Sequence, residues 1–185
     1  MFLDFATLDV VMSKARLQEL SEDTLQHIQT VRNSVGHRLV SLPSWDDLGP
    51  DERKSIDSRA YELSRLTCVI YQNAVMFSLF PHRGWQNGLT GRLRWLISLD
   101  DRKSTANRGL DNLVIWCLCI GAIASYEGTN SEYFRKTLRE RLSERYEDPS
   151  KQLLAVTAVL HTFVWSNEAC DMGLQMVWNE TFKRP

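Results

Sequence analysis

Residue types that could carry chemistry are few and scattered in this chain. Cys117 and Cys119 are two residues apart in an apolar segment, which places them about 200° apart around a helix. They therefore cannot bind one ion from an intact helix. Neither a second cysteine pair nor a histidine pair at ligand spacing completes a zinc set. The sequence predicts no metal site and no metal cofactor.

The patterns of nucleophilic and phosphate chemistry are also incomplete. His161 and Cys170 both fall in segments rich in apolar positions, and no serine is flanked by the glycines of a nucleophile elbow. Asp100 and Asp101 resemble the start of an acidic motif that holds magnesium-diphosphate in all-helical terpene synthases, but Ser104 stands where a further acid is needed. We predict that the chain is not an enzyme and has no catalytic residue or cofactor, and we keep a magnesium-dependent helical enzyme as the least favoured alternative.

A group of arginines and tryptophans is the remaining candidate for a binding surface. Arginine and aromatic side chains are enriched at protein interfaces, so such a group could contact a partner or an effector. An ordinary solvated arginine face is the simpler interpretation. The candidate residues are Arg83, Trp85, Arg92, Arg94 and Trp95.

One apolar segment indicates how these residues would be positioned. Residues 113–124 read LVIWCLCIGAIA, without a charged or strongly polar side chain. A helix that is apolar on every side must be surrounded by other elements or by lipid, and this segment is well short of the ~20 residues that cross a bilayer. The sequence predicts a central helix over 113–125 with other helices packed around it.

Helical spacing dominates the rest of the chain as well. Apolar positions recur three or four residues apart, and no segment shows sustained alternation. We predict an all-α single domain of about seven helices over residues 1–185, with 1–20 as a candidate for a loosely ordered N-terminal segment. The segment from Pro50 to Pro81 is expected to be one long helix or two helices with a kink, and a turn-rich connection over 82–88 and a short helix over 89–97 follow it. The other expected helices are one after Ser21, one opened by the Thr129–Glu132 capping box, one opened by Asp148-Pro149, and a last one that carries Cys170, Leu174, Val177, Trp178 and Phe182.

Composition and charge exclude several classes of protein. With 43% hydrophobic and 24% charged residues among 185, the chain resembles an ordinary globular domain rather than a disordered one. A formal net charge of -1 gives no general affinity for nucleic acid or anionic membrane. The four scattered cysteines are typical of buried, reduced side chains in an intracellular protein.

Three segments, taken in order, carry a family resemblance over roughly residues 55–182. They are apolar helical segments with aromatic residues at characteristic places: Leu66 to Met76; Leu113 to Ser125, with Trp116, Gly121 and Ala122, followed by the aromatic pair Tyr133-Phe134; and Phe163-Val164-Trp165 with Cys170 and Trp178-Asn179-Glu180. In order and spacing they resemble the C-terminal regulatory region of fungal zinc-cluster transcription factors.

The resemblance implies a nuclear, all-helical regulatory domain that acts through co-regulators, self-association or a small-molecule effector, with DNA binding carried elsewhere. In that family a separate module binds two zinc ions through six cysteines. The four cysteines of this chain lack that arrangement, so the chain is either a fragment that begins downstream of the module or a relative that lost it. An alternative function is a dimerisation or scaffold domain without a ligand, in which the amphipathic face of residues 50–80 pairs between two copies.

Overall fold

A computed structural model describes residues 21–76, 83–99, 108–126, 128–146 and 148–182. All regular structure in these ranges is helical, which confirms the predicted all-α class. The chain separates by contacts into two compact units, residues 1–43 and 44–185. The assignment of residues 1–185 to one domain stays a prediction, and the expected loose segment 1–20 lies outside the described residues.

The described part of the first unit is helix α2, Glu22–Ser41. Its acidic first turn, Glu22 and Asp23, and its basic last turn, Arg38, complement the partial charges at the two ends of a helix. Ile28, Val35 and Leu39 are buried and fall on one side of the helix because they are seven and four residues apart. The prediction of an amphipathic helix after Ser21 is confirmed.

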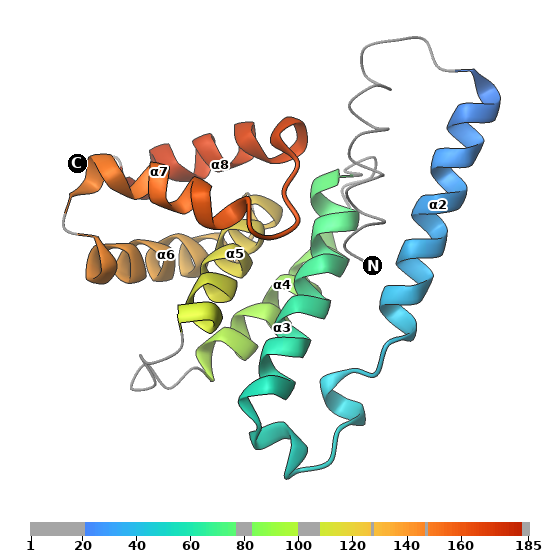
Figure 1. The fold of residues 1–185 in the computed structure, drawn as a ribbon, viewed down its shortest axis with the longest axis horizontal. Coiled ribbons are helices and arrows are strands. Elements are labelled where there is room, and N and C mark those ends of the chain that lie inside the picture. The colour runs from blue at the N-terminus through green and yellow to red at the C-terminus, as the bar shows by residue number, and fades with distance from the viewer. Residues whose placement is uncertain (1–20, 77–82, 100–107, 127, 147, 183–185) are drawn as a thin grey trace. The chain divides into compact units, whose positions relative to one another are not determined.

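The second unit is a bundle of α-helices (Figure 1). Two 3-10 turns precede the first of these helices, and a π-helical turn follows it. In chain order the described elements are η1 (Trp45–Asp47), η2 (Glu52–Lys54), α3 (Ile56–Ile70), η3 (Tyr71–Met76), α4 (Arg83–Ser98), α5 (Arg108–Ala124), α6 (Ser131–Arg145), α7 (Pro149–Leu160) and α8 (Asn167–Phe182).

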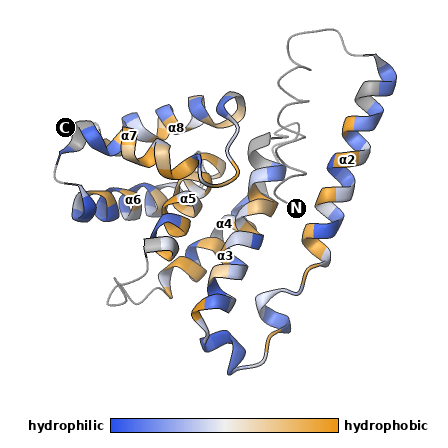
Figure 2. Ribbon diagram, viewed as in Figure 1, coloured by the Kyte–Doolittle hydropathy of each residue, from blue (hydrophilic) through white to orange (hydrophobic). Residues whose placement is uncertain are grey.

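Helix α5 is the centre of this unit, as the apolar segment predicted. It contacts α3, α4, α6, α7 and α8, and every residue from Val114 to Ile120 is fully or almost fully buried. Figure 2 shows hydrophobic residues along α5 and mainly hydrophilic residues along α6. Trp116 anchors α5 to the loop between α7 and α8, because its indole N–H donates to the Val164 carbonyl at 3.0 Å and its ring stacks on Phe163 at 5.2 Å.

The arginines of α6 fasten this helix to its neighbours at both ends. Arg141 and Arg145 bind Asp111 in the first turn of α5, at 2.7 and 3.5 Å. Arg135 pairs with Glu180 of α8, and Arg139 donates to the carbonyl of Thr181. A cation beside the last carbonyls of α8 also complements the negative end of that helix. The strongly charged face of α6 therefore holds the bundle together.

The contact between α5 and α6 depends on a residue without a side chain. A Cβ atom built on Gly121 would lie 2.5–2.8 Å from three ring atoms of Phe134, which is completely buried. We expect Gly121→Ala to lower the free energy of unfolding by about 1–3 kcal/mol, because overpacking outweighs the gain in helix propensity. Urea unfolding followed by circular dichroism measures this. Gly88→Ala is the matched control in α4: nothing lies within 4 Å of its Cβ position, so it should stabilise by about 0.5–1 kcal/mol. Equal effects of the two changes would contradict the tight α5–α6 contact.

Several predicted helix starts are wrong, and the central helix α5 begins at Arg108 rather than at Leu113. The long helix begins at Ile56, not at Pro50, because the Ser55 hydroxyl accepts from the Asp57 backbone N–H at 3.2 Å and caps the helix there. Residues 52–54 form a separate 3-10 turn. In α6 the N-cap is Asn130 rather than Thr129. The Asn130 side chain binds Thr90 and the Asn87 carbonyl in α4, at 3.1 and 3.3 Å.

Helix α4 is longer than predicted. It begins at Arg83, so the expected turn-rich connection is helical from that residue on. The apolar residues Leu153 and Trp165 are not buried. The inward side of α6 and α7 is formed by completely buried residues: Phe134, Leu138, Leu142, Val156 and Leu160. Among the described residues, no helix combines the length and apolar character that a bilayer crossing requires.

Candidate functional site

The predicted arginine and tryptophan surface divides over two sides of α4. Trp85, Arg92 and Trp95 share one broad side of the helix, whereas Arg94 is nine residues from Trp85 and therefore points about 180° away from it. We name the first side, with Leu99 just beyond the helix, the α4 outer face. Its apolar members are unusually accessible, with 47% of Trp85 and 46% of Trp95 exposed. The side chain of Arg83 lies outside the described residues.

Arg94 contacts α6 instead of joining this face. Its guanidinium lies 4.9 Å from the centre of the Tyr133 ring and donates to the Asn130 side-chain oxygen at 3.5 Å. A cation over an aromatic face is attracted by the ring quadrupole. Arg94 therefore helps to hold α4 against the start of α6, and the structure does not bring it together with Trp85.

Arg92 belongs to a chain of charged residues that runs from the surface to the interior. At the surface it binds the Asp46 carboxylate at 2.7 Å. Deeper, its Nε atom lies 3.8 Å from Glu62, whose carboxylate is completely buried. Glu62 in turn accepts two hydrogen bonds from Arg65, at 2.7 and 2.9 Å. These bonds raise the pKa of the Arg65 guanidinium. Together these four charged residues connect η1, α3 and α4.

The turn η1 places Trp45 beside the α4 outer face. Trp45 is buried and meets Trp95 edge to face, with ring centres 6.3 Å apart, a favourable arrangement of aromatic rings. The turn is closed by the Ser44 backbone N–H, which donates to the Asp47 carboxylate at 2.6 Å and lowers the pKa of that carboxyl. Sequence reasoning missed the role of Trp45. The Ser44–Asp47 capping spacing was the available signal for an ordered turn.

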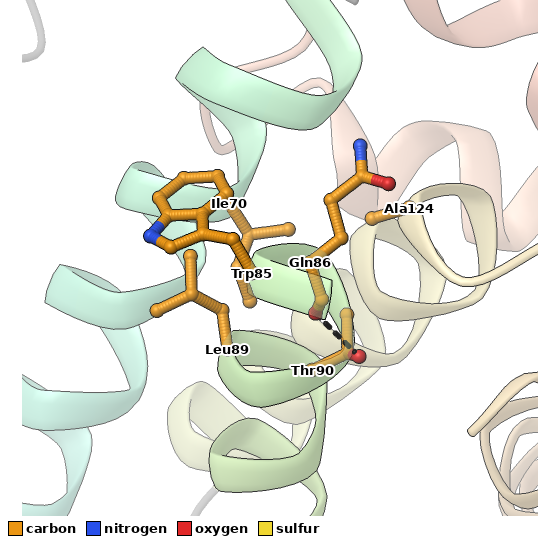
Figure 3. A pocket seen from close by; sticks show the side chains of 6 residues that line it. All are labelled: Ile70, Trp85, Gln86, Leu89, Thr90 and Ala124. Atoms are coloured by element: carbon orange, nitrogen blue, oxygen red, sulfur yellow. Dashed lines mark hydrogen bonds between the residues drawn. The ribbon is translucent and has the colours of Figure 1, made fainter. Parts of the chain in front are cut away.

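A small hollow lies at the N-terminal end of the same helix. It is lined by Ile70, Trp85, Gln86, Leu89, Thr90 and Ala124, and it is too small to hold a water molecule. Figure 3 shows Trp85 lying beside Leu89, and the Thr90 hydroxyl bonded to the Gln86 carbonyl at 2.8 Å. Pockets for drug-sized ligands usually enclose about 300–1,000 Å³. This hollow therefore has room for neither a metabolite nor a partner side chain.

The four cysteines are buried thiols on three helices. Cys117 faces α3, where the Thr67 hydroxyl donates to its sulfur at 3.1 Å, whereas Cys119 lies near Cys170 of α8. The opposite placement predicted for Cys117 and Cys119 is confirmed. Burial raises the pKa of Cys68 and of Cys117 to about 12, and it raises that of Cys119 as well. Thiols held in this protonated form are poor nucleophiles.

The other chemical candidates remain apart or undescribed. His161 is exposed in the turn after α7, whereas Cys170 is completely buried in α8. Within the described ranges, no group of three or more His, Cys, Asp or Glu side chains could hold a metal ion. Asp100 and Asp101, which the magnesium alternative requires, lie outside the described residues. The predicted absence of catalysis stays a prediction.

Comparisons of the chain with family models, with curated proteins and with solved structures found no match. The resemblance to the fungal regulatory region rests on the sequence segments that carry it.

Proposed function

We propose that this chain is a non-catalytic regulatory domain of a fungal transcription factor, which acts in the nucleus through protein or effector contacts while DNA is bound elsewhere. The proposal rests on the sequence resemblance. Its principal structural support is that the three segments that carry the resemblance meet around α5.

Side-chain contacts join these segments in pairs. Thr67 of the first segment donates to Cys117 of the second. Gly121 of the second segment accommodates the ring of Phe134, which belongs to the aromatic pair. Trp116 of the second segment donates to Val164 of the third. The three segments that carry the resemblance thus pack against one another in one unit. If the chain has the fold of the fungal regulatory region, these contacts explain why the segments occur in this order and spacing.

The α4 outer face is the contact surface that we propose for this domain. Monomeric domains rarely leave several large apolar side chains together on the surface, and tryptophan is enriched among residues that dominate binding energy. Trp85 and Trp95 are each about half exposed, and Leu99 is similarly accessible.

The alternative of dimerisation through residues 50–80 has less support. Its apolar stripe is the part of α3 that packs on α4 and α5, and Leu63, Leu66 and Ile70 are almost completely buried there. Ile56 and Tyr61 are the large apolar residues of α3 that remain exposed. Two such side chains are a small basis for a stable dimer interface.

A reporter experiment tests regulation by this chain. The full 185-residue chain is fused to a heterologous DNA-binding module in a fungal host, and reporter expression is compared with that of the module alone. We expect the fusion to change expression about tenfold in either direction. Trp95→Ala should remove most of this change, because loss of a central aromatic contact costs roughly 2 kcal/mol or more of binding energy.

Met172→Ala in α8 is the matched control, since Met172 is 73% exposed and belongs to a different helix. We expect it to leave the reporter response unchanged. A folded fusion that behaves like the DNA-binding module alone would overturn the proposal. If Trp95→Ala and Met172→Ala reduce the reporter response equally, the assignment of the α4 outer face is wrong, but the proposed regulatory function is not affected.

Binding of the purified chain to duplex DNA tests the division of labour. Fluorescence anisotropy with labelled duplexes should show no sequence-specific binding in the nanomolar range, because the net charge of -1 supplies little attraction to phosphates. Specific nanomolar binding by this chain alone would contradict the assignment of DNA contact to another module. Sedimentation at micromolar concentration separates a monomeric domain from the dimerisation alternative.

A further inference from the structure

We draw no further inference here: the strongest candidate, the α4 outer face around Trp85, Trp95 and Leu99, carries nothing beyond the proposed contact surface because nothing in the described ranges shows what covers it, and its arginine Arg92 is already paired with Asp46.

Discussion

Glu62→Ala is expected to lower the free energy of unfolding by about 3–5 kcal/mol, because it leaves a buried guanidinium without its carboxylate. Arg65 is 9% exposed and donates two short hydrogen bonds to Glu62. Arg92 would lose the same partner on its inner side. Since small domains are stable by roughly 5–15 kcal/mol in total, this change should remove a large share. Urea unfolding monitored by far-ultraviolet circular dichroism gives the value.

Two further variants of these charged residues provide the controls. Asp46 pairs with Arg92 at the surface, where its side chain is 64% exposed, so Asp46→Ala should cost less than about 1 kcal/mol. The double variant Glu62→Leu with Arg65→Leu should recover part of the loss, because it removes both buried charges together. If Glu62→Ala costs no more than Asp46→Ala, the carboxylate is not buried as described.

Stability should fall steeply above pH 9 because the folded core keeps its thiols protonated. The pKa of Cys68 and of Cys117 is raised from 9.0 to about 12, so the folded state binds their protons more tightly than the unfolded state. The contribution is complete below pH 9 and is lost as the pH rises from 9 toward 12. At pH 10.5 each thiol should lower the free energy of unfolding by about 2 kcal/mol relative to pH 7. Chemical unfolding at a series of pH values measures the slope.

The matched variant for this effect is Cys68→Ala with Cys117→Ala. Its stability at pH 7 will be lower because of the lost packing, but its further loss between pH 7 and 10.5 should be about 4 kcal/mol smaller than that of the unchanged chain. Lysine and tyrosine residues titrate in both proteins, so their contribution cancels when the two slopes of unfolding free energy against pH are subtracted. Parallel slopes would show that the two thiols are not buried in the folded state.

The sequence predicted the fold well where apolar periodicity was strong and less well at helix ends. Residues 113–125 were recognisable because the segment has no polar side, and this segment is indeed the centre of its unit. Helix α4 was underestimated because Gly84 and Gly88 indicated a turn. Both glycines are helical in the structure, where packing of α4 on α3 and α5 offsets their cost of about 1 kcal/mol each.

The candidate surface could be predicted only in part. Residue types pointed to α4, but the expected group treated Arg92 and Arg94 as equivalent. Helical geometry alone already separates them by about 200°, and their partners, Asp46 and Tyr133, come from distant parts of the chain. The opposite charges of Glu62 and Arg65 at i,i+3 were a local signal for the buried pair. The neighbourhood of Trp45 and Trp95 had no comparable signal, because their contact depends on tertiary packing.

Burial of all four native thiols has a practical consequence for labelling chemistry. Maleimide dyes and cross-linkers react with accessible thiolates, and Cys68, Cys117, Cys119 and Cys170 are each at most 1% exposed. A single new cysteine at position 95 or 172 would therefore be the fast-reacting thiol of the native protein, without prior removal of the others. A cysteine in place of the exposed Gly88, on the same side of α4, meets nothing within 4 Å. Cross-linking through that position would keep Trp95 and would capture whatever molecule rests on that side of α4.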